Sequence, residues 1–256
     1  MEEYVNNKVI STGIYDHIIV PSKHEPRWEL FQKSIKNYYV VSQKLFDIYS
    51  NIDDLNKPLC TCSDGVDLKL FTVRDPTKYY PENIRARPIK IGWAGNSGWG
   101  RNDHKGLHTI IKPVIIKLMA DGYDIQLEIA DRNILWRTQE DMPDFYHTID
   151  IFVCASFSEG TPNPVLEAMA CGLVVVSTDV GIVPEAFGEL QQAYIVDRTV
   201  IAFYNKIKQL LDNVDLLEAL SRENLVSIRN WDWQIKAQNF IEYFKKISAL
   251  RCSDGE

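Results

Sequence analysis

The chain has 256 residues, of which 45% are hydrophobic and 25% charged, as in ordinary globular proteins. Its formal net charge of −7 argues against the broad basic face that nucleic-acid binding uses, and leaves room for a local basic pocket. The sequence has no apolar run near the roughly 20 residues that span a bilayer, and no signal peptide at its N-terminus. The five cysteines are few and odd in number, which favours a reducing compartment. We therefore expect a cytoplasmic protein, and a peripheral membrane contact stays open.

The first 88 residues predict a short α/β segment followed by a linker. The linker is indicated by the prolines and charges between Arg74 and Pro88. Cys60 and Cys62 lack the spacing of a zinc knuckle and have no second pair, so no metal site is predicted. The predicted elements are strands at 14–20 and 38–42, helical spacing over 28–35, a helix at 43–49 and a turn at 63–67.

From Ile89 onward, predicted strands alternate with predicted helices. The strands are expected at 89–95, 125–130, 151–154, 174–177 and 194–196. The helices are expected from Leu107 to Gly122 with a kink or offset start at Pro113, then at 142–148, after Asn163, over 200–211 and over 233–247. This alternation predicts an α/β fold, a Rossmann-like parallel sheet flanked by helices, whose ligands bind beyond the carboxyl ends of the strands. The loops 96–106, 131–137, 155–163 and 178–184 should all lie at that edge.

Two carboxylates carry the clearest chemical signal. Glu159 lies in the loop after a strand, and Glu167 lies in the first turn of the next helix, for which Asn163 is the expected N-cap. A carboxylate can accept two hydroxyls, which suits a ribose or hexose diol. Backbone donors at this helix start suit an anion; those available are on Gly160, Thr161, Asn163, Val165 and Leu166. The alternative is a solvated loop glutamate and an ordinary helix glutamate.

The loop after the first strand of this sheet supplies cations. Gly95 permits a close backbone approach to a ligand, and Arg101 and Lys105 offer positive charge to a diphosphate. Growing negative charge on a leaving diphosphate is what such cations stabilise. The alternative is a solvated surface loop. Weaker candidates near the same edge are His104, His108, Asp131, Arg132, Arg137 and Glu185.

The stretch from Glu159 through Gly172, with the following valines and Gly181–Glu185, resembles the nucleotide-sugar site of family-4 retaining glycosyltransferases. That family has the two-domain GT-B fold. The resemblance implies that Glu167 holds the donor ribose, that Glu159 lies by the transferred sugar, and that Lys105 matches the family's Lys-Gly pair. The family's arginine follows the strand glycine, where this chain has Asn96, so Arg101 is a displaced substitute.

The resemblance also implies a division of the chain. Residues 1–85 would be a partial acceptor-side segment with its linker, residues 86–232 the donor-binding domain, and residues 233–256 a C-terminal crossover helix and tail. The expected activity is transfer of a sugar from a nucleotide-diphosphate sugar to a hydroxyl acceptor with retention, in glycan or cell-envelope polysaccharide synthesis, without a cofactor or metal.

Two further interpretations stay open. Because residues 1–85 are short for an acceptor domain, the chain is alternatively a non-catalytic nucleotide-sugar-binding module or an incomplete enzyme that needs a partner chain with an acceptor domain. A weaker alternative is a GT-B-like epimerase or phosphorylase, although no lysine that would hold pyridoxal phosphate can be identified.

Overall fold

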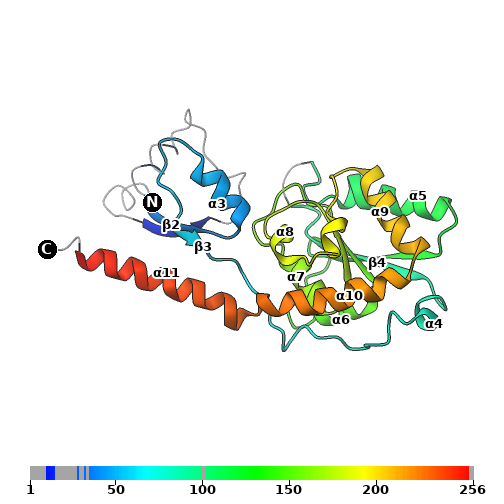
Figure 1. Ribbon diagram of the computed structural model, residues 1–256. Coiled ribbons are helices and arrows are strands. Elements are labelled where there is room, and N and C mark those ends of the chain that lie inside the picture. Colours follow the sequence, from blue (N-terminus) through cyan, green and yellow to red (C-terminus); the bar gives the residue numbers. More distant parts are fainter. Residues whose placement is uncertain (1–9, 15–27, 29–31, 33–34, 100–101, 254–256) are drawn as a thin grey trace.

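Two parallel β-sheets, each packed against helices, organise the computed structural model (Figure 1). The structure describes residues 10–14, 28, 32, 35–99 and 102–253. A three-stranded sheet has the order β1-β2-β3, and a four-stranded sheet has the order β5-β4-β6-β7. The predicted α/β class with a parallel sheet flanked by helices is confirmed. In the described part of the chain, every helix is too short or too polar to cross a lipid bilayer.

The larger unit contains the four-stranded sheet, whose strands have the expected positions. They are β4 (Ile89–Gly95), β5 (Ile125–Asp131), β6 (Ile151–Cys154) and β7 (Val174–Ser177). Every residue of β6 and β7 is buried, because helices cover both faces of the sheet. Val153 belongs to the hydrophobic cluster on one face and Phe152 to the cluster on the other. This double coverage explains why both strands are continuous apolar runs.

Helices of the larger unit begin and end where proline and glycine require it. Pro113 lies in the first turn of α5, which follows a short π-helical segment, so the predicted offset start is confirmed. Gly122 and Gly172 follow α5 and α7 with φ of 91° and 76°, as expected for helix ends. The elements are η2 (Leu107–Ile111), α5 (Lys112–Ala120), α6 (Met142–Thr148), α7 (Asn163–Ala170), α8 (Val183–Ala186), η3 (Gln191–Tyr194), α9 (Val200–Asp212), α10 (Asp215–Ser227) and η4 (Ile228–Trp231).

Two predictions about the bounds of strands and helices in this unit are wrong. Residues 194–196 do not form a strand, because η3 occupies the segment up to Tyr194 and Ile195 makes one isolated bridge to Ser177. Asn163 is not the N-cap of α7, because Pro162 holds that position and Asn163 is already helical. The run Pro-Asn-Pro therefore begins the helix one residue earlier than the capping preference of asparagine suggests.

The smaller unit contains β1 (Ile10–Ile14), β2 (Ile35–Val40), β3 (Cys60–Thr61) and α3 (Gln43–Ser50). Ser42 caps α3, because its Oγ accepts from Leu45 N at 3.2 Å. The strand expected at 38–42 starts three residues earlier and ends at Val40. Of the segment 28–35, for which helical spacing was predicted, Ile35 belongs to β2, and residues 29–31 and 33–34 lie outside the described residues. The strand expected at 14–20 is described only at Ile14, which ends β1, and residues 15–20 lie outside the described residues.

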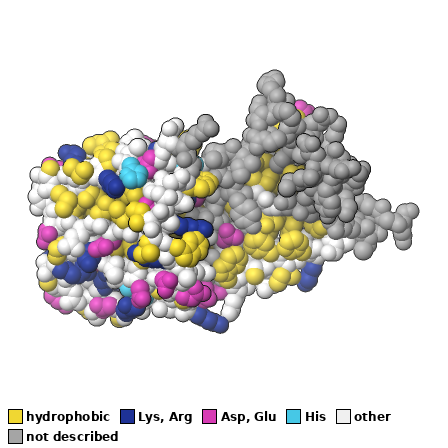
Figure 2. Space-filling model, turned by 180° about the vertical axis from the view of Figure 1, so that it is seen from behind, with side chains coloured by type: hydrophobic (Ala, Val, Ile, Leu, Met, Phe, Trp, Pro, Cys, Tyr) yellow, Lys and Arg dark blue, Asp and Glu magenta, His cyan; other side chains and the backbone are white. Residues whose placement is uncertain are grey.

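The C-terminal helix α11 (Trp233–Ser253) passes from the larger unit along the smaller one (Figure 1). Tyr243 on this helix packs against Tyr39 of β2 with ring centroids 5.0 Å apart, and its hydroxyl donates to Asn37 O at 3.1 Å. Seen from behind, hydrophobic side chains gather on the surface beside the grey atoms (Figure 2). Ile241 and Phe244 of α11 are exposed. The helix therefore joins the two units by contact with the smaller sheet.

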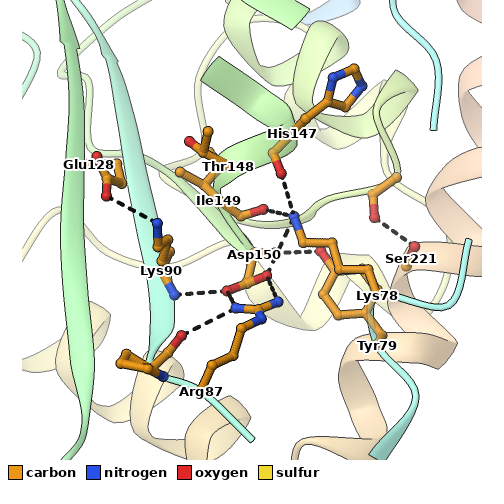
Figure 3. A network of polar contacts seen from close by, with 12 residues as sticks. Lys78, Tyr79, Arg87, Lys90, Glu128, His147, Thr148, Ile149, Asp150 and Ser221 are labelled. Carbon is orange, nitrogen blue, oxygen red and sulfur yellow. Dashed lines mark hydrogen bonds and ion pairs between the residues drawn. The ribbon is translucent and has the colours of Figure 1, made fainter. Parts of the chain in front are cut away.

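The segment between Arg74 and Pro88 has the composition of a linker but is packed onto the larger unit. It includes α4 (Pro81–Ile84). Arg87 makes two hydrogen bonds to the buried carboxylate of Asp150, at 2.7 and 2.8 Å, and Lys78 lies 3.4 Å from the same carboxylate. Tyr79 OH donates to Asp150 O at 2.6 Å (Figure 3). The segment predicted as a linker from its composition is thus held in place by charged and aromatic side chains that have buried partners.

Candidate active site

A cavity of about 410 Å³ opens at the carboxyl ends of β4 and β5. This is the edge at which the alternation of strands and helices places a ligand. Four of the predicted site residues line it: Gly95, Lys105, Asn163 and Glu167. Its other lining residues are Ala94, Asn96, Trp99, Ala130, Arg132, Leu135, Trp136, Arg137, Met142 and Pro164.

Lys105 and Glu159 form an ion pair at one side of this cavity. Their side chains are 22% and 14% exposed, so the pair is shielded from water in part. The ammonium of Lys105 also lies 5.3 Å from the centre of the Trp99 ring. Trp93 Nε1 donates to Lys105 O at 3.1 Å, which fixes the backbone at this position. The structure thus brings together the two residues predicted to be catalytic, from loops 54 positions apart.

The loop that carries Glu159 is held by close backbone contacts with its neighbours. A Cβ at Gly181 would lie 1.9 Å from Gly160 O, and Ile182 N donates to this same oxygen at 3.1 Å. Gly106 has φ of 74°, and a Cβ there would lie 2.4 Å from Ala155 O. Only glycine fits such contacts. The glycines at 106 and 181 therefore set the position of Glu159 relative to Lys105.

Glu167 lies in the second turn of α7, not in its first turn as predicted, and is held by a tyrosine that sequence reasoning missed. Tyr146 OH donates to Glu167 Oε2 at 2.6 Å. Burial raises the pKa of the Glu167 carboxyl, and the bond from Tyr146 lowers it only in part. Burial and the neighbouring carboxylate together raise the pKa of Tyr146 well above its ordinary value. Tyr146 therefore stays protonated and remains a donor to the carboxylate.

Some of the predicted backbone donors are engaged within the loop itself. Asn163 N donates to Thr161 O at 2.9 Å, and Val165 N donates to Pro162 O at 2.8 Å. Val165 is fully buried and is not among the residues that line the cavity. The buried hydroxyl oxygen of Thr161 has no hydrogen-bond partner among the described residues, but Thr161 does not line the cavity either. Of the predicted donors in this loop, Asn163 is the one whose residue lines the cavity.

The aromatic and guanidinium groups that also line the cavity were not predicted as a unit. The Arg132 guanidinium lies 4.0 Å from the centre of the Trp136 ring, and this tryptophan is 60% exposed. Arg137 lines the cavity beside them. The sequence signal was two arginines flanking an apolar run after β5, which does not show that they stack. Arg101, the displaced arginine, lies outside the described residues.

Two weaker candidates have structural partners. His104 is buried, and its Nε2 lies 3.1 Å from Ser158 O. Asp131 is buried and accepts hydrogen bonds from Ser97 N and Asn133 N, both at 3.0 Å. These contacts tie together the loops that border the cavity. We assign neither residue to ligand binding.

Residues 107–213 match the family model of glycosyl transferases group 1. The matched segment includes Glu159, Glu167 and Tyr146, and it begins two positions after Lys105. This segment is therefore similar to a group 1 glycosyltransferase domain. Its resemblance to the nucleotide-sugar site of such enzymes is thus supported at the level of group 1, by a comparison that does not rest on the glutamate pair alone.

Two similar curated proteins are bacterial glycosyltransferases. The chain is 32% identical over 109 residues to the O-antigen chain mannosyltransferase B of Escherichia coli, a match that covers 42% of this chain and 28% of that protein. It is 27% identical over 241 residues to the N,N'-diacetylbacillosaminyl-diphospho-undecaprenol alpha-1,3-N-acetylgalactosaminyltransferase of Campylobacter jejuni, with 86% and 63% covered. The matches span less than two thirds of the length of either relative.

Solved structures show the same fold at low sequence identity. Sucrose-phosphate synthase from Thermosynechococcus elongatus has a TM-score of 0.66 at 17% identity, with 88% of this chain and 62% of that chain covered. Anabaena Alr3699/HepE in complex with UDP has a TM-score of 0.67 at 14% identity, with 95% and 74% covered. The fold of the chain is therefore similar to that of GT-B glycosyltransferases.

Proposed function

We propose that this chain binds a nucleotide-diphosphate sugar in the 410 Å³ cavity and transfers the sugar to a hydroxyl acceptor with retention of anomeric configuration. The observation that carries the proposal is that Lys105 and Glu167 line one cavity and that Glu159 forms an ion pair with Lys105. The setting we propose is glycan or cell-envelope polysaccharide synthesis, the field of the relatives from Escherichia coli and Campylobacter jejuni.

Each of the three groups has a distinct part in this proposal. Glu167 accepts hydrogen bonds from the ribose diol, as the resemblance implies, and Lys105 faces the diphosphate. Glu159 lies beside the transferred sugar and holds the Lys105 ammonium in place through the ion pair. As the bond to the sugar breaks, negative charge grows on the leaving diphosphate, and a fixed ammonium in a partly dry site lowers the barrier.

The part of the cavity wall formed by Arg132, Trp136 and Arg137 adds positive charge and a flat aromatic surface. This composition suits an anionic ligand that also carries a ring, which agrees with a nucleoside diphosphate. We propose that the reaction needs no bound metal or organic cofactor. Nucleotide affinity that is unchanged by EDTA would agree with this proposal, and a loss restored by Mg²⁺ would contradict it.

A second candidate function is a nucleotide-sugar-binding module that works with a partner chain. The described sheet of the smaller unit favours it, because its edge strand β3 has only two residues and offers little surface for an acceptor. In this case the partner chain supplies acceptor-binding surface, and the chain by itself binds the donor without transferring its sugar.

Calorimetry and a transfer assay with labelled donors together test both candidates. A panel of UDP- and GDP-linked sugars is titrated into the wild-type chain, and the tightest ligand is then used in the assay. Transfer with retained configuration, lost in Glu159→Ala, supports the enzyme. Binding without transfer supports the module, and a folded chain that binds no member of the panel contradicts both.

A further inference from the structure

Tyr146 is on α6, and its hydroxyl contacts Glu167 in the second turn of α7. The surrounding side chains fix the orientation of its ring. Its side chain is fully buried. The ring makes edge contacts with Phe71, Phe145 and Phe152, with centroids 6.0, 5.4 and 5.9 Å away. Phe71 lies in the segment that joins the two units, Phe145 in α6 and Phe152 in β6. A side chain packed on three sides in this way keeps one orientation.

The hydroxyl of Tyr146 is aimed at one oxygen of a single carboxylate. The distance from Tyr146 OH to Glu167 Oε2 is 2.6 Å, as in a charge-assisted hydrogen bond. Glu167 lines the cavity. With Oε2 taken by the tyrosine, the second oxygen, Oε1, is left for a ligand, and the plane of the carboxylate is set by the bond to Oε2.

We propose that Tyr146 is a positioning residue that orients the Glu167 carboxylate toward the ribose diol of the donor. The inference rests on the proposed function, because it needs Glu167 to bind ribose. Tyr146 acts in two ways. It fixes which oxygen faces the ligand, and it stabilises the ionised form that accepts hydroxyl protons.

The charges around Glu167 define the expected pH behaviour. Burial raises the pKa of Glu167, and the bond from Tyr146 opposes that rise. The other titratable or charged groups nearby are Cys171, near the end of α7, and Lys105, Arg132 and Arg137, which line the same cavity. Removing only the hydroxyl should therefore raise the pKa of Glu167 further. Nucleotide binding should then be lost at a higher pH than in the wild type as the solution is made more acidic.

The variant Tyr146→Phe tests this, because it keeps the ring and its packing. Tyr79→Phe is the matched control. Tyr79 is also buried and donates at 2.6 Å, but to the backbone oxygen of Asp150 (Figure 3), away from the cavity. We expect Tyr146→Phe to weaken UDP or GDP binding about tenfold at neutral pH. The loss should be smaller for the 2′-deoxy nucleotide, and Tyr79→Phe should leave both affinities unchanged.

A carbon-13 NMR titration of the Glu167 carboxyl gives a reading that needs no ligand. The pKa of Glu167 should be higher in Tyr146→Phe than in the wild type or in Tyr79→Phe. Equal pKa values, or equal loss for ribose and deoxyribose nucleotides, would overturn the positioning role. A wild-type chain that binds neither UDP nor GDP would overturn the proposed function itself, and with it this inference.

Discussion

Lys105 is the residue on which the proposed chemistry depends most, because its ammonium faces the cavity and pairs with Glu159. We expect Lys105→Ala to lower kcat/KM by about 10²- to 10³-fold, since one preorganised group that stabilises leaving-group charge contributes on this scale. Steady-state kinetics with the tightest donor measures the effect. If the chain binds without turnover, the same substitution should weaken nucleoside diphosphate binding in calorimetry.

The matched control for this residue is Lys90→Ala. Lys90 also pairs with a carboxylate, that of Glu128 at 3.6 Å, but it does not line the cavity. Its side chain is 34% exposed, so its loss should change stability by about 1 kcal/mol or less and leave donor binding unaltered. Equal effects of the two alanine variants on nucleotide affinity would show that the site does not use Lys105.

At the scale of single elements, the loop that carries Glu159 depends on the absence of a side chain at Gly181. This residue has φ of 47°, and an added Cβ would meet Gly160 O at 1.9 Å. We expect Gly181→Ala to shift the loop, to destabilise the fold by about 1–3 kcal/mol and to abolish donor binding. Urea unfolding and calorimetry measure the two effects.

Gly122→Ala is the control that separates backbone strain at positive φ from the steric clash expected in Gly181→Ala. Gly122 has φ of 91°, and nothing lies within 4 Å of an added Cβ. It should lose stability through backbone strain alone and keep donor binding. Normal nucleotide affinity in Gly181→Ala would contradict the close packing of the two loops at the site.

The segment from Arg74 to Pro88 is held on the larger unit by ion pairs with Asp150, a buried carboxylate beside β6. Asp150→Ala leaves Lys78 and Arg87 without their shared partner. Breaking such a buried pair costs about 3–5 kcal/mol, and chemical denaturation should show a loss of this size. Arg85→Ala is the control, because Arg85 pairs with Asp215 at 3.1 Å in an exposed pair and should cost about 1 kcal/mol or less. Similar losses for both variants would contradict a structural role for the buried network.

The elements that could be predicted are those set by the properties of neighbouring residues in the sequence. Strands β6 and β7 are read as apolar runs because both of their faces are buried. The offset start of α5 follows from the missing N–H of Pro113. The bond between Tyr146 and Glu167 could not be predicted, because it depends on how α6 packs against α7 across 21 positions. The stacking of Arg132 on Trp136 could not be predicted either, because it depends on the backbone path of one loop.

At the scale of the whole molecule, polar contacts among the described residues join the two units. Gln43 N donates to Glu185 Oε1 at 2.8 Å, and Lys44 lies 3.0 Å from Asp179. Both contacts link the start of α3 to the loop and helix at 178–186. The chain passes between the two units twice, near Val66 and near Trp231. These two segments lie side by side, because Val66 N donates to Trp231 O at 2.8 Å.

We expect the double variant Lys44→Ala/Glu185→Ala to loosen this contact and to increase the radius of gyration, because the remaining crossings act as a hinge. Small-angle X-ray scattering measures the change. The double variant Lys69→Ala/Glu189→Ala removes the same charges without removing these contacts and should leave the radius unchanged. An unchanged radius in the first variant would show that α11 and the crossings alone hold the units in place.

The most direct measurement is a crystal structure of the chain with a bound UDP- or GDP-sugar. The account predicts that the nucleotide occupies the cavity at the ends of β4 and β5, with ribose hydroxyls on Glu167, the diphosphate beside Lys105, and the sugar next to Glu159. A nucleotide bound elsewhere on the molecule, or a ribose that does not contact Glu167, would contradict it.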